Sequence, residues 1–161
     1  MRNPLLPDDV YAAIDKAVAK YPVGQQRSAT KAALMLVQRF NKGYLTTPLM
    51  DAVAEYLLLP PIAVYEVASF YTLFESEPVG VYKISLCTNV SCYLRGCEDI
   101  KDYLFKRLQI KFGETTEDKR FTLKEVECLA ACTQAPAMQI NGDYHENLTL
   151  ESIEKILAEL E

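Results

Sequence analysis

The residues best suited to chemistry in this 161-residue chain are its five cysteines. Cys87, Cys92 and Cys97 follow one another at even intervals in "CTNVSCYLRGC", and Cys128 and Cys132 form a second group in "CLAAC". Thiolates act as nucleophiles, redox groups and soft metal ligands. Because five thiols cannot all enter one site that takes four ligands, the pattern raises the question of which cysteine is left out.

The spacing leaves three kinds of site open. Structural zinc can be bound by four cysteine sulfurs, but these ligands usually come in C-x-x-C pairs. A 2Fe-2S cluster is wider, and wider separations recur in the ligand loops of ferredoxins. Dithiol redox chemistry usually needs a C-x-x-C pair, which the sequence lacks. The local sequence favours the cluster, because small residues separate Cys87 from Cys92 and apolar residues separate Cys128 from Cys132.

Hydrophobic periodicity divides the chain into a helical region, residues 1–75, and a mixed region, residues 79–161, joined by the polar break "ESEP". The first region predicts helices after Pro7, from about Ser28 to Gly43, from Thr47 to Pro60, and from Pro61 onward. The second predicts a strand over 79–86, a helix over 92–108, a strand over 121–127, a hairpin around Asn141-Gly142 and a helix over 149–160. The predicted fold class is therefore α+β, an N-terminal helical bundle followed by an α/β domain.

This order of elements places the two cysteine pairs after two successive strands. Cys87 and Cys92 lie where the first strand ends, and Cys128 and Cys132 lie just after the next strand. Successive strands are often neighbours in space. We therefore expect two loops at one end of the sheet to bring four thiols together around one metal centre.

The predicted helix over 92–108 gives Cys92 and Cys97 different roles. Cys92 falls at the start of the helix, where the dipole favours an anion and lowers a thiol pKa. Cys97 lies about 140° further round the helix, on an apolar stripe with Leu94 and Leu104. We therefore expect Cys97 to be a small buried residue outside the metal site.

Composition excludes several other classes of function. The net charge is −5, and the basic residues are scattered among acidic ones, which argues against nucleic-acid binding. The single histidine, His145, leaves little for Cys–His catalysis, and the six glycines form no phosphate-binding loop. No apolar run approaches the roughly 20 residues that span a bilayer, and "MRNPLLPDDVY" has no features of a secretory signal. We expect a cytoplasmic protein without direct membrane insertion.

The cysteines and the sequence around them also carry a family resemblance. The pattern "CTNVSC … CLAAC", with 35 residues between the pairs, resembles the thioredoxin-like 2Fe-2S ferredoxin subunits of NADH:quinone oxidoreductase, or respiratory complex I. So does the preceding "VYEVASFYTLFESEPVGVYKISLC", and the likeness covers nearly the whole chain. The resemblance implies a thioredoxin-like C-terminal domain and one 2Fe-2S cluster ligated by Cys87, Cys92, Cys128 and Cys132.

The same resemblance implies a partner. NADH delivers a hydride whereas a 2Fe-2S centre accepts one electron, so a flavin must divide the electron pair. We expect FMN and NADH to bind a partner subunit, and this chain to be an electron-transfer subunit of a larger oxidoreductase, with no catalytic residue of its own. The complex would hold it at the cytoplasmic face of the inner membrane. Related subunits serve NAD-linked hydrogenases and formate dehydrogenases, and a zinc-stabilised interaction module is the alternative from another class.

Near the second cysteine pair, two residues depart from the family pattern and the isomer of one peptide bond is not determined by the sequence. Ala130 and Thr133 stand where relatives commonly have glycine, which alters how the backbone approaches a cluster. Pro136 precedes a strand, as the cis-proline of thioredoxin-like folds does, but the sequence leaves the isomer of the Ala135–Pro136 bond open.

Overall fold

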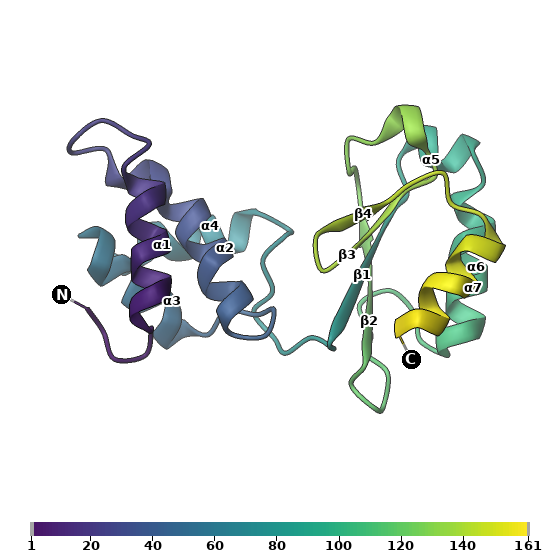
Figure 1. The fold of residues 1–161 in the computed structure, drawn as a ribbon, viewed down its shortest axis with the longest axis horizontal. Coiled ribbons are helices and arrows are strands. Elements are labelled where there is room, and N and C mark those ends of the chain that lie inside the picture. Colours follow the sequence, from purple (N-terminus) through teal and green to yellow (C-terminus); the bar gives the residue numbers. More distant parts are fainter. Residues whose placement is uncertain (1, 161) are drawn as a thin grey trace. The chain divides into compact units, whose positions relative to one another are not determined.

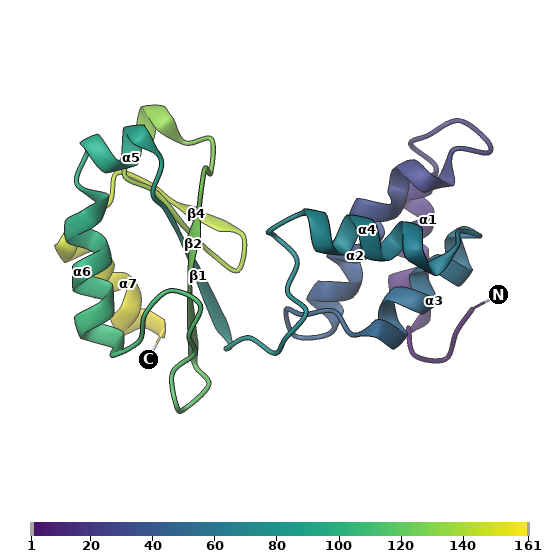
Figure 2. The same ribbon diagram turned by 180° about the vertical axis from the view of Figure 1, so that it is seen from behind.

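A computed structural model describes residues 2–160 and divides the chain into two compact units, Met1–Pro78 and Val79–Glu161. Figures 1 and 2 show that the first unit is helical and that the second combines a sheet with helices. The predicted α+β fold class is therefore confirmed. Among residues 2–160, no helix combines the length and the apolar character needed to cross a membrane.

The N-terminal unit is built from helices with apolar residues at helical spacing. Their bounds are α1 (Asp8–Val18), α2 (Thr30–Phe40), α3 (Thr47–Leu57) and α4 (Pro61–Phe70), with a short 3-10 helix, η1 (Gln26–Ala29), before α2. Ser28, the predicted start of the second helix, lies inside η1 instead. The core of this unit takes fully buried side chains from each helix, among them Ile14, Leu34, Val53 and Val64.

The C-terminal unit contains a four-stranded sheet in the order β2-β1-β3-β4. The strands are β1 (Tyr82–Cys87), β2 (Phe121–Val126), β3 (Met138–Ile140) and β4 (Asp143–His145). The helices are α5 (Val90–Leu94), α6 (Cys97–Leu108), the 3-10 turn η2 (Cys132–Gln134) and α7 (Leu150–Leu160). β1 pairs with β2 in parallel, whereas β1 with β3 and β3 with β4 pair antiparallel.

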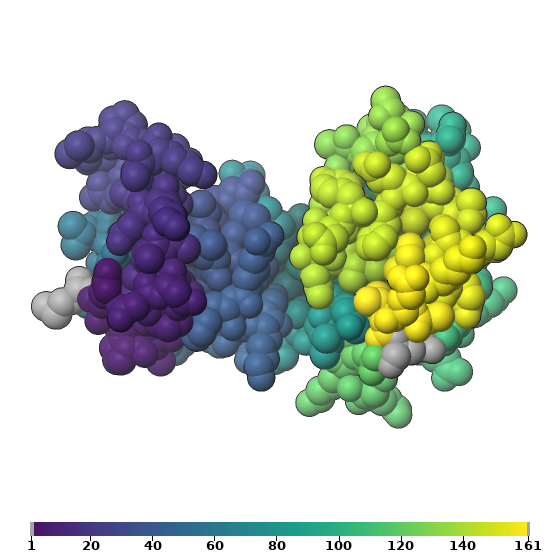
Figure 3. Space-filling model, viewed as in Figure 1, coloured from purple at the N-terminus to yellow at the C-terminus, as the bar shows by residue number. Residues whose placement is uncertain are grey.

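One face of this sheet is covered by α6 and α7, which lie on the same side in both ribbon views (Figures 1 and 2). Ile84 and Leu86, on alternate positions of β1, point into the core that these helices close, as the alternating pattern of the sequence predicts. Full burial of such a side chain stabilises the fold by about 1.5–3 kcal/mol. Figure 3 shows α7 and the segment that precedes it on the surface of the unit.

The turn between β3 and β4 has the predicted hairpin geometry. Asn141 and Gly142 both have positive φ, 53° and 100°, as a primed two-residue turn requires. The Asn141 side chain also joins the turn to β1, since its Oδ1 accepts the Lys83 N–H at 2.9 Å and its Nδ2 donates to the Val81 carbonyl at 2.8 Å. Just before β3, the Ala135–Pro136 bond is cis.

The prediction of one continuous helix over residues 92–108 is wrong, because a short non-helical segment separates α5 from α6. Gly96 has a φ of 91°, a left-handed conformation that glycine adopts without steric cost. The break separates α5 from α6, so the apolar stripe predicted across it is interrupted. Leu94, predicted to lie on the buried stripe, is 77% exposed, whereas Leu104 is fully buried.

Replacing Leu104 by Ala should therefore lower the free energy of unfolding by about 2–5 kcal/mol, because it removes buried methyl groups and leaves a cavity. The matched change, Leu94→Ala, should alter it by less than about 0.5 kcal/mol. Guanidinium unfolding of the full chain, followed by circular dichroism, measures both. Equal losses from the two changes would show that α5 and α6 form one continuous buried stripe after all.

Candidate functional site

The candidate site begins at the carboxyl ends of β1 and β2. Because these strands are parallel, both end at the same edge of the sheet, and Cys87 pairs with Val126 in the register. The Thr88 N–H donates to the Val126 carbonyl at 3.2 Å, and the Thr88 hydroxyl donates to Glu125 Oε1 at 3.0 Å. The loop that follows Cys87 is thus attached to the end of the strand that leads to Cys128.

Three cysteines lie together in a small buried cluster at this edge. Cys87, Cys92 and Cys97 pack with Ala135, and Leu129 covers them in part. The Cys87 thiol donates a long hydrogen bond of 3.8 Å to the carbonyl of Glu127, next to Cys128. This part of the site is therefore shielded from solvent, and residues from both cysteine segments contact it.

Cys97 is fully buried, as expected, on the face of α6 that also carries Ile100, Leu104 and Leu108. It is the first residue of α6, and it also packs against Cys87 and Cys92, which the prediction did not include. The expected divergence of Cys92 and Cys97 around one helix does not occur.

Burial affects the acidity of the Cys92 and Cys97 thiols. It raises the pKa of Cys92 to about 11, and a hydrogen bond with the Cys87 thiol adds to the shift. Burial also raises the pKa of Cys97, with a smaller contribution from the negative charge of Glu98. The predicted lowering of the Cys92 pKa by a helix dipole is wrong, because α5 has five residues and the cost of desolvating a thiolate exceeds its effect.

The other two cysteines are exposed, on the segment that connects β2 to β3. Cys128 accepts a hydrogen bond at 3.2 Å from the backbone N–H of Ala130. Ala130 has a φ of 58°, in the left-handed region that favours glycine. The hydroxyl of Tyr144 in β4 donates to the carbonyl of Leu129 at 2.9 Å.

Cys132 begins η2, which is held at its far end by Asn147. The Asn147 backbone N–H donates to the Gln134 carbonyl at 2.7 Å, and its side-chain Nδ2 donates to Gln134 Oε1 at 2.6 Å. Sequence reasoning missed both Tyr144 and Asn147. Their only signal was the Asn-Gly turn, which locates the hairpin but not the carbonyl groups that the following residues reach.

The chemistry of the donors fits a group bound by thiolates. All five thiols are free, and a backbone N–H already points at one sulfur. Within the part of the chain that the structure describes, no three Cys, His, Asp or Glu side chains are gathered closely enough to bind a metal ion. The two pairs nevertheless stand on loops that are joined at one edge of the sheet, which suits a group wider than a single ion.

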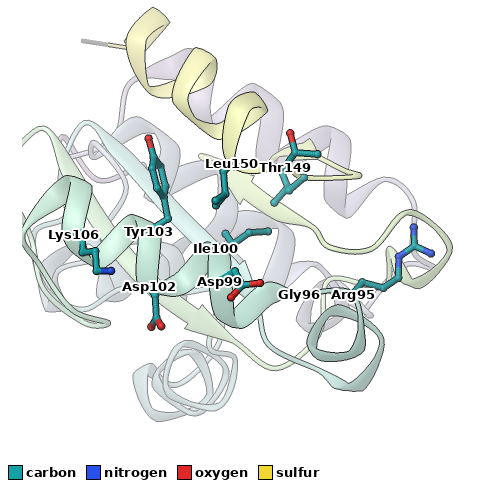
Figure 4. A pocket seen from close by; sticks show the side chains of 10 residues that line it. Arg95, Gly96, Asp99, Ile100, Asp102, Tyr103, Lys106, Thr149 and Leu150 are labelled. Atoms are coloured by element: carbon teal, nitrogen blue, oxygen red, sulfur yellow. The ribbon is translucent and has the colours of Figure 1, made fainter.

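A shallow pocket of about 470 Å³ lies elsewhere in the C-terminal unit, between α6 and the start of α7. Figure 4 shows Arg95 at one end of it and Lys106 at the other, with Tyr103 and Ile100 between them. None of its lining residues is a cysteine, so the pocket is separate from the thiol site.

Comparison with known proteins gives one family match and relatives whose names agree with each other. Residues 14–161 match the family described as thioredoxin-like 2Fe-2S ferredoxin. A Rickettsia conorii protein named as a subunit of NADH-quinone oxidoreductase is 47% identical over 147 residues, which are 91% of this chain and 88% of that protein. A Rhizobium meliloti protein, also named as a subunit of NADH-quinone oxidoreductase, is 46% identical over 144 residues, covering 89% of this chain and 84% of that protein.

A solved structure shares the fold. It is an air-oxidized NAD+-reducing NiFe-hydrogenase, with a TM-score of 0.67 and 24% sequence identity. The match covers 79% of this chain but 22% of the hydrogenase chain, so the present chain corresponds to a small part of that protein.

The burial pattern predicts which thiols react in the folded chain prepared without metal. Cys128 and Cys132 should be alkylated by iodoacetamide at pH 8 well before the buried cysteines. A pKa of about 11 leaves roughly one Cys92 in a thousand as the reactive thiolate at that pH, so its alkylation should accelerate as the pH rises. Peptide mass mapping over time measures the order. Alkylation of Cys92 at the rate of Cys128 would contradict the described burial.

Proposed function

We propose that this chain, which belongs to the family of thioredoxin-like 2Fe-2S ferredoxins, binds one 2Fe-2S cluster through Cys87, Cys92, Cys128 and Cys132. The observation that carries the proposal is the parallel pairing of β1 with β2, which ends both strands at one edge and joins the two cysteine loops there. Cys97 is left out of the ligand set, and packs behind Cys87 and Cys92 as a small apolar residue.

The residues around the thiols suit a negatively charged centre that changes charge by one electron. When bound, a 2Fe-2S cluster supplies one-electron acceptance and donation. Burial of Cys87 and Cys92 under Leu129 keeps water from one side of the site, and the Ala130 N–H offers positive potential to Cys128 on the other. Both features are means by which a protein adjusts a reduction potential.

The names of the relatives support a larger assembly. Both relatives described above carry the name of a subunit of NADH-quinone oxidoreductase and match over most of their length. We propose that this chain is the corresponding subunit, with FMN and NADH on a partner subunit, and that the complex holds it at the cytoplasmic face of the inner membrane. The fold shared with an NAD+-reducing hydrogenase is compatible with a hydrogenase as the alternative parent complex, whereas a formate dehydrogenase stays a prediction of the sequence.

Serine substitutions test the ligand set. Replacing Cys87, Cys92, Cys128 or Cys132 by Ser should remove or perturb the cluster, since a serine oxygen is a harder and poorer ligand for iron than a thiolate. Iron and acid-labile sulfide counts, together with the visible absorption spectrum before and after dithionite, measure the effect. The matched control is Cys97→Ala, which should keep the iron and lose some packing energy.

Two results would overturn this assignment. Iron loss in Cys97→Ala equal to that in the Ser variants would place Cys97 among the ligands. A colourless wild-type protein with one bound zinc would instead support the zinc-stabilised interaction module, whose four-sulfur chemistry is the same.

Dependence on a flavin partner gives a separate prediction. NADH should not bleach the isolated chain, because its sequence has no nucleotide-binding glycine loop and flavin is needed to divide the electron pair. NADH should bleach it once a flavoprotein that co-purifies with the tagged chain is added. Stopped-flow absorbance measures both reactions, and rapid bleaching of the isolated chain by NADH would contradict the proposed division of labour.

A further inference from the structure

The peptide bond between Leu129 and Ala130 is held at both of its polar ends. Its carbonyl accepts the hydrogen bond from the Tyr144 hydroxyl at 2.9 Å, and its N–H donates to Cys128 Sγ at 3.2 Å. A trans peptide unit is planar, and its carbonyl and N–H point in opposite directions. Whatever fixes the direction of the carbonyl therefore also fixes the direction of the N–H.

This segment does not adopt its conformation from local preference alone. Ala130 has a φ of 58°, and residues with a Cβ seldom occupy this left-handed region. Cys128 is exposed and Ala130 lies at the surface beside it, so little packing holds them in place. Among the contacts that restrain the segment are those of Leu129, which packs on the buried cysteines, and of Tyr144.

Tyr144 can restrain the segment because the sheet holds Tyr144 itself. In β4 it lies opposite Gln139 of β3, and Gln139 in turn lies opposite Ser85 of β1. The strand that carries the hydroxyl is thus in register with the strand that ends at Cys87. The Tyr144 side chain is 52% exposed, and the hairpin that carries it lies on the surface in Figure 3. Its exposure makes substitution possible without opening the core.

We infer that Tyr144 is a positioning residue for the metal centre, whose hydroxyl holds the Leu129–Ala130 peptide so that the Ala130 N–H stays directed at the Cys128 sulfur. The inference rests on the proposed function, because it takes Cys128 as a ligand. An N–H directed at a ligand sulfur stabilises the more negative, reduced state and raises the reduction potential. The hydrogen bond from Tyr144 also polarises the peptide and strengthens the N–H as a donor.

The test is Tyr144→Phe in the full chain with its cluster. Iron, sulfide and the melting temperature should stay as in the wild type, because the change removes one exposed hydroxyl. The reduction potential should become more negative, with an equilibrium constant for reduction roughly fivefold lower, the effect of about one neutral hydrogen bond. The matched control is Tyr93→Phe, which alters an exposed tyrosine next to Cys92 and should leave the potential unchanged. Across residues 2–160, the Tyr93 hydroxyl has no hydrogen-bond partner.

A second measurement observes the N–H directly. Electron–nuclear double resonance of the reduced protein, before and after exchange into D2O, should show an exchangeable proton coupled to the centre in the wild type and in Tyr93→Phe. Its coupling should be weaker in Tyr144→Phe. An unchanged potential and coupling in Tyr144→Phe would overturn the inference while leaving the proposed function intact, and so would loss of iron, which would make Tyr144 a support for the fold. A wild-type chain without iron and sulfide would instead overturn the proposed function.

Discussion

The parallel pairing of β1 with β2 is the constraint on which the site depends. A parallel pair places two carboxyl ends at one edge, and here Cys87 ends β1 with Cys92 following in α5, while Cys128 and Cys132 follow the end of β2. An antiparallel pair would place the same loops at opposite edges, about the length of a strand apart. The pairing is stable because β1 and β2 bury alternate apolar residues under α6 and α7, so the core of the unit and the geometry of the site have the same origin.

The elements that carry strong periodicity could be predicted from the sequence. The alternation along β1, the Asn141-Gly142 turn and the apolar face of α7 each appear in the structure as their patterns indicate. The stretch from 92 to 108 could not be predicted correctly, because its apolar spacing continues across the break. A single left-handed glycine, Gly96, interrupts the helix there, so Leu94 is exposed while Cys97 keeps its place on the buried face of α6 and also contacts Cys87 and Cys92.

The contacts that hold the exposed pair of cysteines follow from long-range geometry and carry no local signal. The hydrogen bond from Tyr144 to Leu129 joins residues that are 15 positions apart, and it depends on the β3–β4 register. The pKa of Cys92 illustrates the same limit, since the depth of burial of the thiol decides whether the pKa is raised or lowered. Residue types and spacing therefore identify the cysteines as candidate ligands, whereas the burial and the hydrogen bonds of their thiols can be described only once the fold is known.

The proposed function requires that the two cysteine pairs at one edge of the sheet bind a single 2Fe-2S cluster. Electron paramagnetic resonance of the dithionite-reduced wild-type chain, with spin, iron and sulfide counted on the same sample, measures this binding. We expect one unpaired electron for every two irons and two sulfides, at one cluster per chain. A protein that binds zinc without sulfide, or that gives no signal after reduction despite bound iron, would contradict it.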